Sequence, residues 1–287
     1  MLNALVVGAS RGIGRQIAIT LAKNGYQVGV AAKTTEESAK LPGTIHSVVN
    51  EIQATGGHAI PIVCNVRHEQ DIKEAVDTCI KQFGKLDYVI YNAGAITWKK
   101  VMDTPLKKFD LMHQVNPRGA YCLVQELLPL FLKQGSGKIL LVAPPIYSRF
   151  FKGKTPYSMG KVGMTVLVHG LANELKGTGV SITALWPATV IESQVTVMQG
   201  VPSSVMRKAD IFADACLHIG NEKTDRLNGQ ALIDEDYLRS IGVTDFTPYR
   251  CDLAVEPPRM MPRAFPSLKV TEENEQLHII HDPKSKL

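Results

Sequence analysis

The sequence predicts an α/β fold: a doubly wound, parallel, seven-stranded sheet of Rossmann type, flanked by helices. Two patterns predict it. Short apolar runs alternate with segments of helical periodicity, as in a parallel sheet covered on both faces. Several of the apolar runs are uninterrupted, which is typical of strands buried on both sides. We expect a single domain over residues 1–235 and a C-terminal extension over residues 236–287.

Turn and capping residues divide the chain into elements. Thr104-Pro105 has the pattern of a helix cap followed by proline at the first helical position. Gly25, Gly84 and Gly135 stand where helices are expected to stop. The predicted strands are residues 4–7, 27–31, 59–63, 88–91, 138–142, 181–185 and 231–233, and the predicted helices are residues 11–24, 44–55, 69–83, 106–116, 119–134, 156–177 and 209–220.

The composition is that of an ordinary soluble protein. Of 287 residues, 45% are hydrophobic and 21% charged, and the net charge of +5 comes from basic residues scattered among acidic ones. We therefore expect no nucleic-acid partner. No apolar run approaches the roughly 18 residues of a membrane span, and the apolar start at Leu2 predicts no signal or transit peptide. The histidines and five cysteines lack metal-ligand spacing, so we expect free thiols and no metal.

A glycine-rich turn joins the first predicted strand to the first predicted helix. Its sequence is Gly8-Ala9-Ser10-Arg11-Gly12-Ile13-Gly14. Glycines let the backbone approach a pyrophosphate, and the helix N-terminus supplies unpaired N–H donors. A plain strand–helix turn is the alternative. The residues that we expect to contact a dinucleotide are Gly8, Ser10, Arg11, Gly12, Ile13 and Gly14.

The charges at the end of the second strand favour NADP(H) over NAD. An NAD site usually has an acid there to hold the ribose 2′-hydroxyl. Here the stretch is Ala31-Ala32-Lys33-Thr34, with no acid before Glu36. We expect Lys33 and Arg11 to hold a 2′-phosphate; an ordinary solvated lysine is the alternative for Lys33.

Tyr157 and Lys161 are spaced four residues apart on a predicted helix, so both lie on one face. An ammonium beside a phenol favours the phenolate and is expected to lower the tyrosine pKa from about 10. Such a tyrosine exchanges a proton with an alcohol or carbonyl near neutral pH. With the glycine turn, the pair indicates a nicotinamide-dependent oxidoreductase.

These motifs, in this order, resemble the short-chain dehydrogenase/reductase superfamily over roughly residues 1–235. The resemblance implies that Tyr157 is the acid/base, that Lys161 holds the nicotinamide ribose, and that the backbone of Asn116 holds a water in a proton relay. Two positions depart from the family pattern. Ala188 stands where the family has a glycine, and Asn65 stands where the family more often has an aspartate. The further cofactor contacts that the resemblance implies are Asn65, Val66, Asn92, Ala93, Gly94, Pro187 and Thr189.

Within the superfamily, several segments resemble the hydroxysteroid dehydrogenase-like group. They are residues 31–34, 41–45, 184–187 and 233–235. That group is peroxisomal and carries a C-terminal sterol-carrier domain. The stretch from Glu256 to Pro266 is proline-rich, and we expect an extended appendage rather than a second domain.

The chain departs from the family at the serine that orients the substrate oxygen. Thirteen residues before Tyr157 stands Pro144, which has no side-chain donor. Tyr147 and Ser148 are nearby hydroxyls, and the sequence does not choose between them. Losing one oxyanion donor typically costs about 10²–10³ in rate.

Three functions fit these observations. The first is hydride transfer between NADP(H) and an apolar carbonyl or alcohol, such as a lipid-like, steroid or specialised metabolite. The second is reduction of a C=C or C=N bond, and the third is cofactor binding with little turnover. The apolar residues expected to face the substrate are Val190, Ile191, Val195, Val197, Met198, Val201 and Met206; an ordinary packed lid explains them equally well.

Two expectations concern partners. The ending Ser285-Lys286-Leu287 predicts recognition by the peroxisomal import receptor. The family resemblance implies a homodimer or homotetramer. The residues expected in its four-helix contact are Leu123, Leu127, Leu130, Val166, Leu167 and Leu171.

Overall fold

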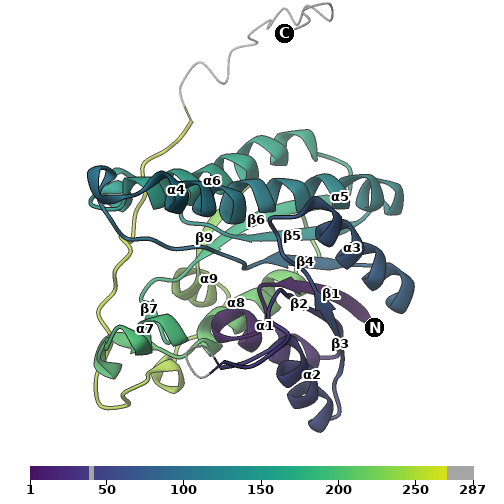
Figure 1. Ribbon diagram of the computed structural model, residues 1–287, viewed down its shortest axis with the longest axis horizontal. Helices are drawn as coiled ribbons and strands as arrows, with labels where there is room; N and C mark the ends of the chain where they lie inside the picture. The colour runs from purple at the N-terminus through teal and green to yellow at the C-terminus, as the bar shows by residue number, and fades with distance from the viewer. Residues whose placement is uncertain (39–41, 270–287) are drawn as a thin grey trace, which may run out of the picture.

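The computed structural model describes residues 1–38 and 42–269. Its centre is a seven-stranded parallel sheet of order β3-β2-β1-β4-β5-β6-β9 (Figure 1). The strands are β1 (Leu2–Val7), β2 (Tyr26–Ala32), β3 (His58–Val63), β4 (Tyr88–Tyr91), β5 (Gly137–Val142), β6 (Val180–Trp186) and β9 (Ala231–Ile233). The seven predicted strands and the Rossmann-type order are confirmed.

The strand order reverses at β1, which pairs with both β2 and β4. Val7, the last residue of β1, lies opposite Ala31 of β2 and Tyr91 of β4. The carboxyl ends of these three strands therefore lie side by side. In open α/β sheets such a reversal opens a crevice where ligands bind.

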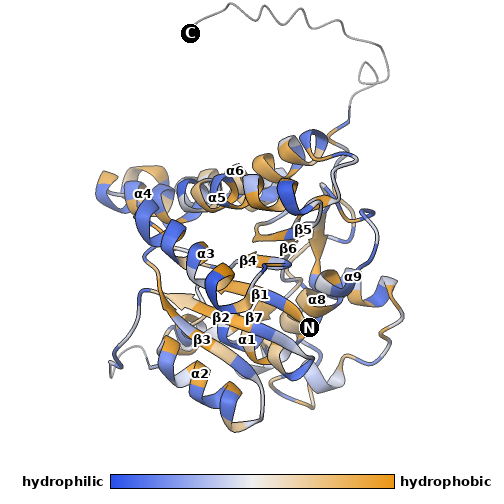
Figure 2. Ribbon diagram, turned by 90° about the vertical axis from the view of Figure 1, so that its right-hand side faces the viewer, coloured by the Kyte–Doolittle hydropathy of each residue, from blue (hydrophilic) through white to orange (hydrophobic). Residues whose placement is uncertain are grey.

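Helices cover both faces of the sheet (Figure 1). One face packs on α1 (Gly12–Lys23), α2 (Ile45–Ala54) and α8 (Asp210–Asn221), and the other on α3 (Glu69–Phe83), α5 (Gly119–Gln134) and α6 (Thr155–Glu174). Figure 2 shows apolar residues gathered on the strands and polar ones on the outer sides of the helices. The sequence pattern of strands buried on both faces therefore reflects two separate cores.

The predicted helices 106–116 and 119–134 are one continuous helical run. α4 (Leu106–His113) passes through a π turn (Gln114–Arg118) into α5. Pro117 lies inside this turn, and proline lacks the N–H that a regular helix needs there. The widened turn places Asn116 in the interior, with no exposed surface.

The sequence pattern gave no bounds for the short elements around the carboxyl edge of the sheet. They are β7 (Val190–Ile191), α7 (Gln194–Met198), β8 (Met206–Arg207) and α9 (Asp234–Ser240). Two-residue strands have no readable periodicity, whereas α7 has a capping box in which the Ser193 hydroxyl accepts from the Thr196 N–H. α9 runs through the expected boundary between residues 235 and 236.

Residues 256–265, named here the C-terminal segment, run over the domain (Figure 1). The Met260 and Met261 N–H groups donate to the Ala188 carbonyl at 2.8 and 3.1 Å. At the start of the segment, Glu256 pairs with Arg207, which is completely buried, and with Arg250 at 2.5 Å. The proline-rich extension is thus held on the loop that follows β6.

The expected assembly stays a prediction, but three of the leucines expected in its contact are wrong. Leu123, Leu127 and Leu171 pack in the core between α5, α6 and the sheet, because their helical spacing faces them inward. Val166 is 58% exposed, so it remains available to a second subunit.

The tripeptide Ser285-Lys286-Leu287 lies outside the described residues. Within the described part of the chain, no helix has the length and apolar character of a membrane span.

Candidate active site

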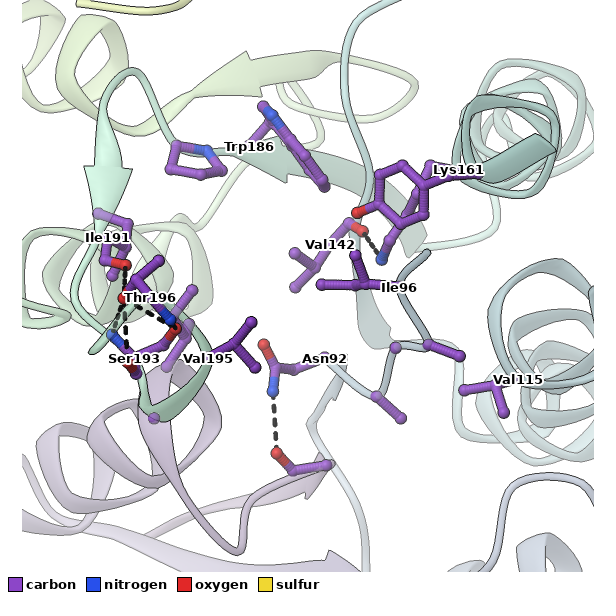
Figure 3. A pocket seen from close by; sticks show the side chains of 18 of the residues that line it. Asn92, Ile96, Val115, Val142, Lys161, Trp186, Ile191, Ser193, Val195 and Thr196 are labelled. Atoms are coloured by element: carbon purple, nitrogen blue, oxygen red, sulfur yellow. Dashed lines mark hydrogen bonds between the residues drawn. The ribbon is translucent and has the colours of Figure 1, made fainter. Parts of the chain in front are cut away.

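A cavity of about 750 Å³ opens at the carboxyl edge of the sheet. Figure 3 shows Lys161, Val142, Ile96 and Trp186 on one side of it and Ile191, Ser193, Val195 and Thr196 on the other, with Asn92 between them. Most residues singled out in the sequence line this one cavity. They are Gly8, Ser10, Arg11, Gly12, Ile13, Lys33, Asn65, Val66, Asn92, Ala93, Gly94, Tyr157, Lys161, Pro187 and Thr189.

Two of the singled-out residues do not line the cavity, Gly14 and Asn116. A Cβ atom on Gly14 would lie 2.2 Å from the Gly8 carbonyl oxygen, so glycine there lets α1 pack directly against the loop. Gly8 itself has φ +87°, and the Asn92 amide donates to its carbonyl at 2.9 Å. Gly14 and Asn92 thus fix the shape of the glycine loop.

The glycine loop leaves donors unused at the start of α1. Arg11 occupies the N-cap with no side-chain cap hydrogen bond, and the first turn contains no acid. The Arg11 Nε atom is buried without a hydrogen-bond partner among the described residues, as is the Thr189 hydroxyl across the cavity. Unpartnered buried donors around a helix N-terminus fit a phosphate-bearing, polar ligand. The residues present therefore fit a dinucleotide.

The charges around the cavity have one sign. The described lining residues include no aspartate or glutamate. Lys33 follows directly after the end of β2 and is exposed. Such a positive cavity attracts an anionic ligand. The cationic lining residues are Arg11, Lys33, Arg67, Arg149, Lys154 and Lys161.

Tyr157 and Lys161 lie in α6, each only 3% exposed, and both line the cavity. Burial raises the pKa of Tyr157 and lowers the pKa of Lys161 to about 7. The expected lowering of the tyrosine pKa is wrong in this structure, because burial penalises both charged forms. The Lys161 ammonium donates to the Val142 carbonyl at 2.9 Å (Figure 3), its one hydrogen bond among the described residues. Tyr157 is therefore protonated at neutral pH.

Asn116 holds a residue of the cavity wall, Ala95, through its side chain. Its side-chain oxygen accepts from the Ala95 N–H at 2.9 Å, and its amide donates to the Ala95 carbonyl at 3.0 Å. Ala95 packs against the cluster that contains Tyr157. The Asn116 carbonyl accepts from the Gly119 N–H in the π turn, and its part in a water relay stays a prediction.

The structure separates the two hydroxyls near Pro144. Pro144 is buried and does not line the cavity; its carbonyl accepts from the Thr165 hydroxyl at 2.7 Å. Ser148 is exposed and lies outside the cavity lining, whereas Tyr147 is part of it.

The apolar wall was predicted in part. Val190, Ile191 and Val195 line the cavity, as expected. The other four do not, because Val197 and Met198 lie on the outer face of α7, Met206 is buried in β8, and Val201 lies beyond them. Sequence reasoning missed wall residues from distant segments, which no local pattern connects. They are Ile96, Trp98, Leu111, Val115, Phe150, Met260 and Met261.

Comparisons with known proteins agree with this geometry. The family model described as short chain dehydrogenase matches residues 2–199. Hydroxysteroid dehydrogenase-like protein 2 from Pongo abelii is 41% identical over 251 residues, 86% of this chain and 60% of that protein. The same protein from Danio rerio is 40% identical over 256 residues, 88% of this chain and 60% of that protein. The chain thus spans about 60% of the length of these curated relatives.

Solved structures show the same fold. A 7α-hydroxysteroid dehydrogenase, solved with NADH and 7-oxo glycochenodeoxycholic acid, is 26% identical with a TM-score of 0.69; the match covers 81% of this chain and 92% of that one. A short chain dehydrogenase from Mycobacterium thermoresistibile is 36% identical with a TM-score of 0.82, over 90% of this chain and 96% of that one. The resemblance to the hydroxysteroid dehydrogenase-like group is confirmed. The chain belongs to the short-chain dehydrogenase/reductase superfamily, a family of oxidoreductases that use a nicotinamide cofactor.

Proposed function

We propose that the chain is an NADP(H)-dependent oxidoreductase that interconverts an apolar carbonyl and its alcohol. The observation that carries this proposal is the position of Tyr157 and Lys161. Both line the same cavity as the glycine loop that precedes α1. A proton donor and a dinucleotide loop in one cavity are what carbonyl reduction requires.

The preference for NADP(H) rests on charge. Lys33 lies where an NAD site has its acid, and none of the described lining residues carries a carboxylate. The Arg11 guanidinium donates to the Gly43 carbonyl at 2.9 Å, and its Nε–H has no partner in the part of the chain that the structure describes. These two cations suit the charge of a 2′-phosphate.

Cofactor titration tests this preference. Lys33→Ala is expected to weaken NADPH binding about tenfold, since one phosphate contact is lost, and to change NADH binding less than twofold. Lys107→Ala, an exposed lysine of α4 outside the cavity, is the matched control. An equal loss for both dinucleotides would contradict the assignment of Lys33 to the 2′-phosphate.

The residues divide the chemistry as follows. A bound nicotinamide would supply or accept the hydride. Tyr157, kept protonated by burial, gives its proton to the oxygen of the carbonyl in the reductive direction. Lys161, with a pKa of about 7, carries a proton in part of the molecules at neutral pH and lies next to that tyrosine on the helix.

The apolar wall supports an apolar substrate. Trp98, Phe150, Val195 and Met260 line the cavity beside the charged rim. The 7-oxo steroid bound by the 7α-hydroxysteroid dehydrogenase is a carbonyl of this class. We therefore propose a lipid-like or steroid carbonyl, with a specialised metabolite of similar polarity as the alternative.

Turnover tests the function directly. NADPH oxidation with apolar ketones and aldehydes is expected for the wild type, and Tyr157→Phe should lower kcat about 10²–10⁴-fold, the usual contribution of a general acid. NADPH affinity should change little in this variant, because the ring is retained. Unchanged turnover in Tyr157→Phe would remove this tyrosine from the mechanism.

A second candidate is favoured by one observation, the buried Pro144 in place of a serine donor. In the reduction of a C=C or C=N bond, the carbon that accepts the hydride carries no oxygen for such a donor to hold. Faster turnover of an enone at its C=C bond than of the matching saturated ketone would decide for this reaction. Tight NADPH binding with no turnover of either compound would instead indicate a low-turnover cofactor-binding protein.

A further inference from the structure

The cavity lacks the serine donor of the family but retains a tyrosine hydroxyl close by. As charge develops on a carbonyl oxygen during reduction, a second hydrogen-bond donor besides the general acid stabilises it. Pro144 offers no donor, and its carbonyl is already bonded to Thr165. The inference below rests on the proposed carbonyl chemistry and asks which side chain takes this position.

Tyr147 lies between Tyr157 and the C-terminal segment. Its ring centroid is 6.0 Å from that of Phe150, and the Phe150 ring is 6.4 Å from that of Tyr157. On its other side, the ring meets Phe265 at 5.5 Å, nearly edge to face. The side chain thus belongs both to the cluster of the general acid and to the cluster around Ala188, in the turn after β6.

The Tyr147 hydroxyl has a weak acceptor. It donates to the Met261 sulfur at 3.2 Å, and a thioether is a poor hydrogen-bond acceptor. Burial raises the pKa of Tyr147 against the opposing effect of Arg149, so the hydroxyl keeps its proton at neutral pH. A carbonyl or alkoxide oxygen in the cavity is a stronger acceptor than the thioether and draws the hydroxyl to itself.

We propose that Tyr147 donates the second hydrogen bond to the substrate oxygen, in place of the serine that Pro144 replaces. Met261 holds the hydroxyl when no substrate is present. Tyr147 keeps its proton throughout, and the proton that ends on the alcohol comes from Tyr157. The C-terminal segment, which carries Met261, therefore completes the substrate site.

The test compares four variants in NADPH oxidation with a panel headed by 2-decanone and 4-nitrobenzaldehyde. Tyr147→Phe keeps the ring and its packing, and should lower kcat about 10²-fold, the low end of the cost of one oxyanion donor. Ser148→Ala, which removes the exposed neighbouring hydroxyl, is the matched control and should stay within twofold. Met261→Leu, in the cavity wall, removes the resting acceptor and should lower kcat less than Tyr147→Phe does. Tyr157→Phe reports on the proposed function itself.

NADPH affinity, measured by nicotinamide fluorescence, should be equal in the wild type and Tyr147→Phe. Normal kcat in Tyr147→Phe beside an inactive Tyr157→Phe overturns the role of Tyr147 and leaves the proposed function standing. An equal loss in Met261→Leu and Tyr147→Phe overturns it as well, because the hydroxyl then acts only through packing. A wild type that binds NADPH but reduces no carbonyl of the panel overturns the proposed function, and this inference with it.

Discussion

Lys161 should make the stability of the protein without cofactor depend on pH in one direction. Its side chain is 3% exposed, and burial lowers its pKa from 10.5 to about 7. At about 1.36 kcal/mol per pKa unit, a fall of this size is on the order of 5 kcal/mol. The unfolded chain keeps the Lys161 proton up to about pH 10.5, whereas the folded chain loses it above about pH 7. The free energy of unfolding therefore rises with pH across this window.

The variant Lys161→Met isolates this effect. The free energy of unfolding of the wild type minus that of the variant should increase by about 2 kcal/mol between pH 7 and pH 9. Taking the difference cancels the titration of the other buried groups, such as Tyr157, which are common to both proteins. The pH-independent loss of the hydrogen bond to Val142 shifts the difference but not its slope.

Urea unfolding at fixed ionic strength measures these values at pH 7, 8 and 9. Lys107→Met, an exposed lysine of α4, is the matched control, and its curve should run parallel to that of the wild type. If the Lys161→Met curve is parallel as well, Lys161 is charged in the folded protein and the assignment of its burial is wrong.

Four further predictions concern the fold and the cell. Gly14→Ala should lower the free energy of unfolding by about 1–3 kcal/mol, the usual cost of overpacking, because its Cβ would lie 2.2 Å from the Gly8 carbonyl oxygen. Gly170→Ala is the control in the same urea assay, because a Cβ added there meets no neighbouring segment within 4 Å. Arg207→Met should lower the free energy of unfolding by about 3–5 kcal/mol and increase proteolysis within residues 256–265, because it leaves Glu235 and Glu256 without this cation. A C-terminal segment that stays intact in limited proteolysis of this variant would contradict the prediction. A fluorescent protein fused before residues 270–287 should enter peroxisomes, and deletion of Ser285-Lys286-Leu287 should leave it outside them. Sedimentation should show a dimer or tetramer that Val166→Lys weakens, since Val166 is exposed on α6; a wild-type monomer would contradict the expected assembly.

The sequence alone determined the sheet, the glycine loop and the position of the tyrosine–lysine pair. Strands buried on both faces require uninterrupted apolar runs, and a phosphate loop requires glycines at set spacings, so both features are local and readable. The doubly wound, Rossmann type of the sheet followed from the alternating pattern and the family resemblance, whereas its strand order was read from the structure. The departure at Pro144 was also visible, because the spacing to Tyr157 is a property of the chain.

Tertiary structure decided what surrounds those motifs. Met260 and Met261 lie about a hundred residues from Tyr157 in sequence, and hydrogen bonds to Ala188, Arg149 and Tyr147 hold them at the cavity wall. The choice between Tyr147 and Ser148 depended on which hydroxyl the fold turns inward. The direction of the Tyr157 pKa shift depended on burial. Burial raises the pKa of Tyr157, and it also lowers the pKa of Lys161, whose charge was expected to favour the phenolate. A sequence fixes which groups are present and how they are spaced along the chain, while desolvation and contacts between distant segments exist only once the chain has folded.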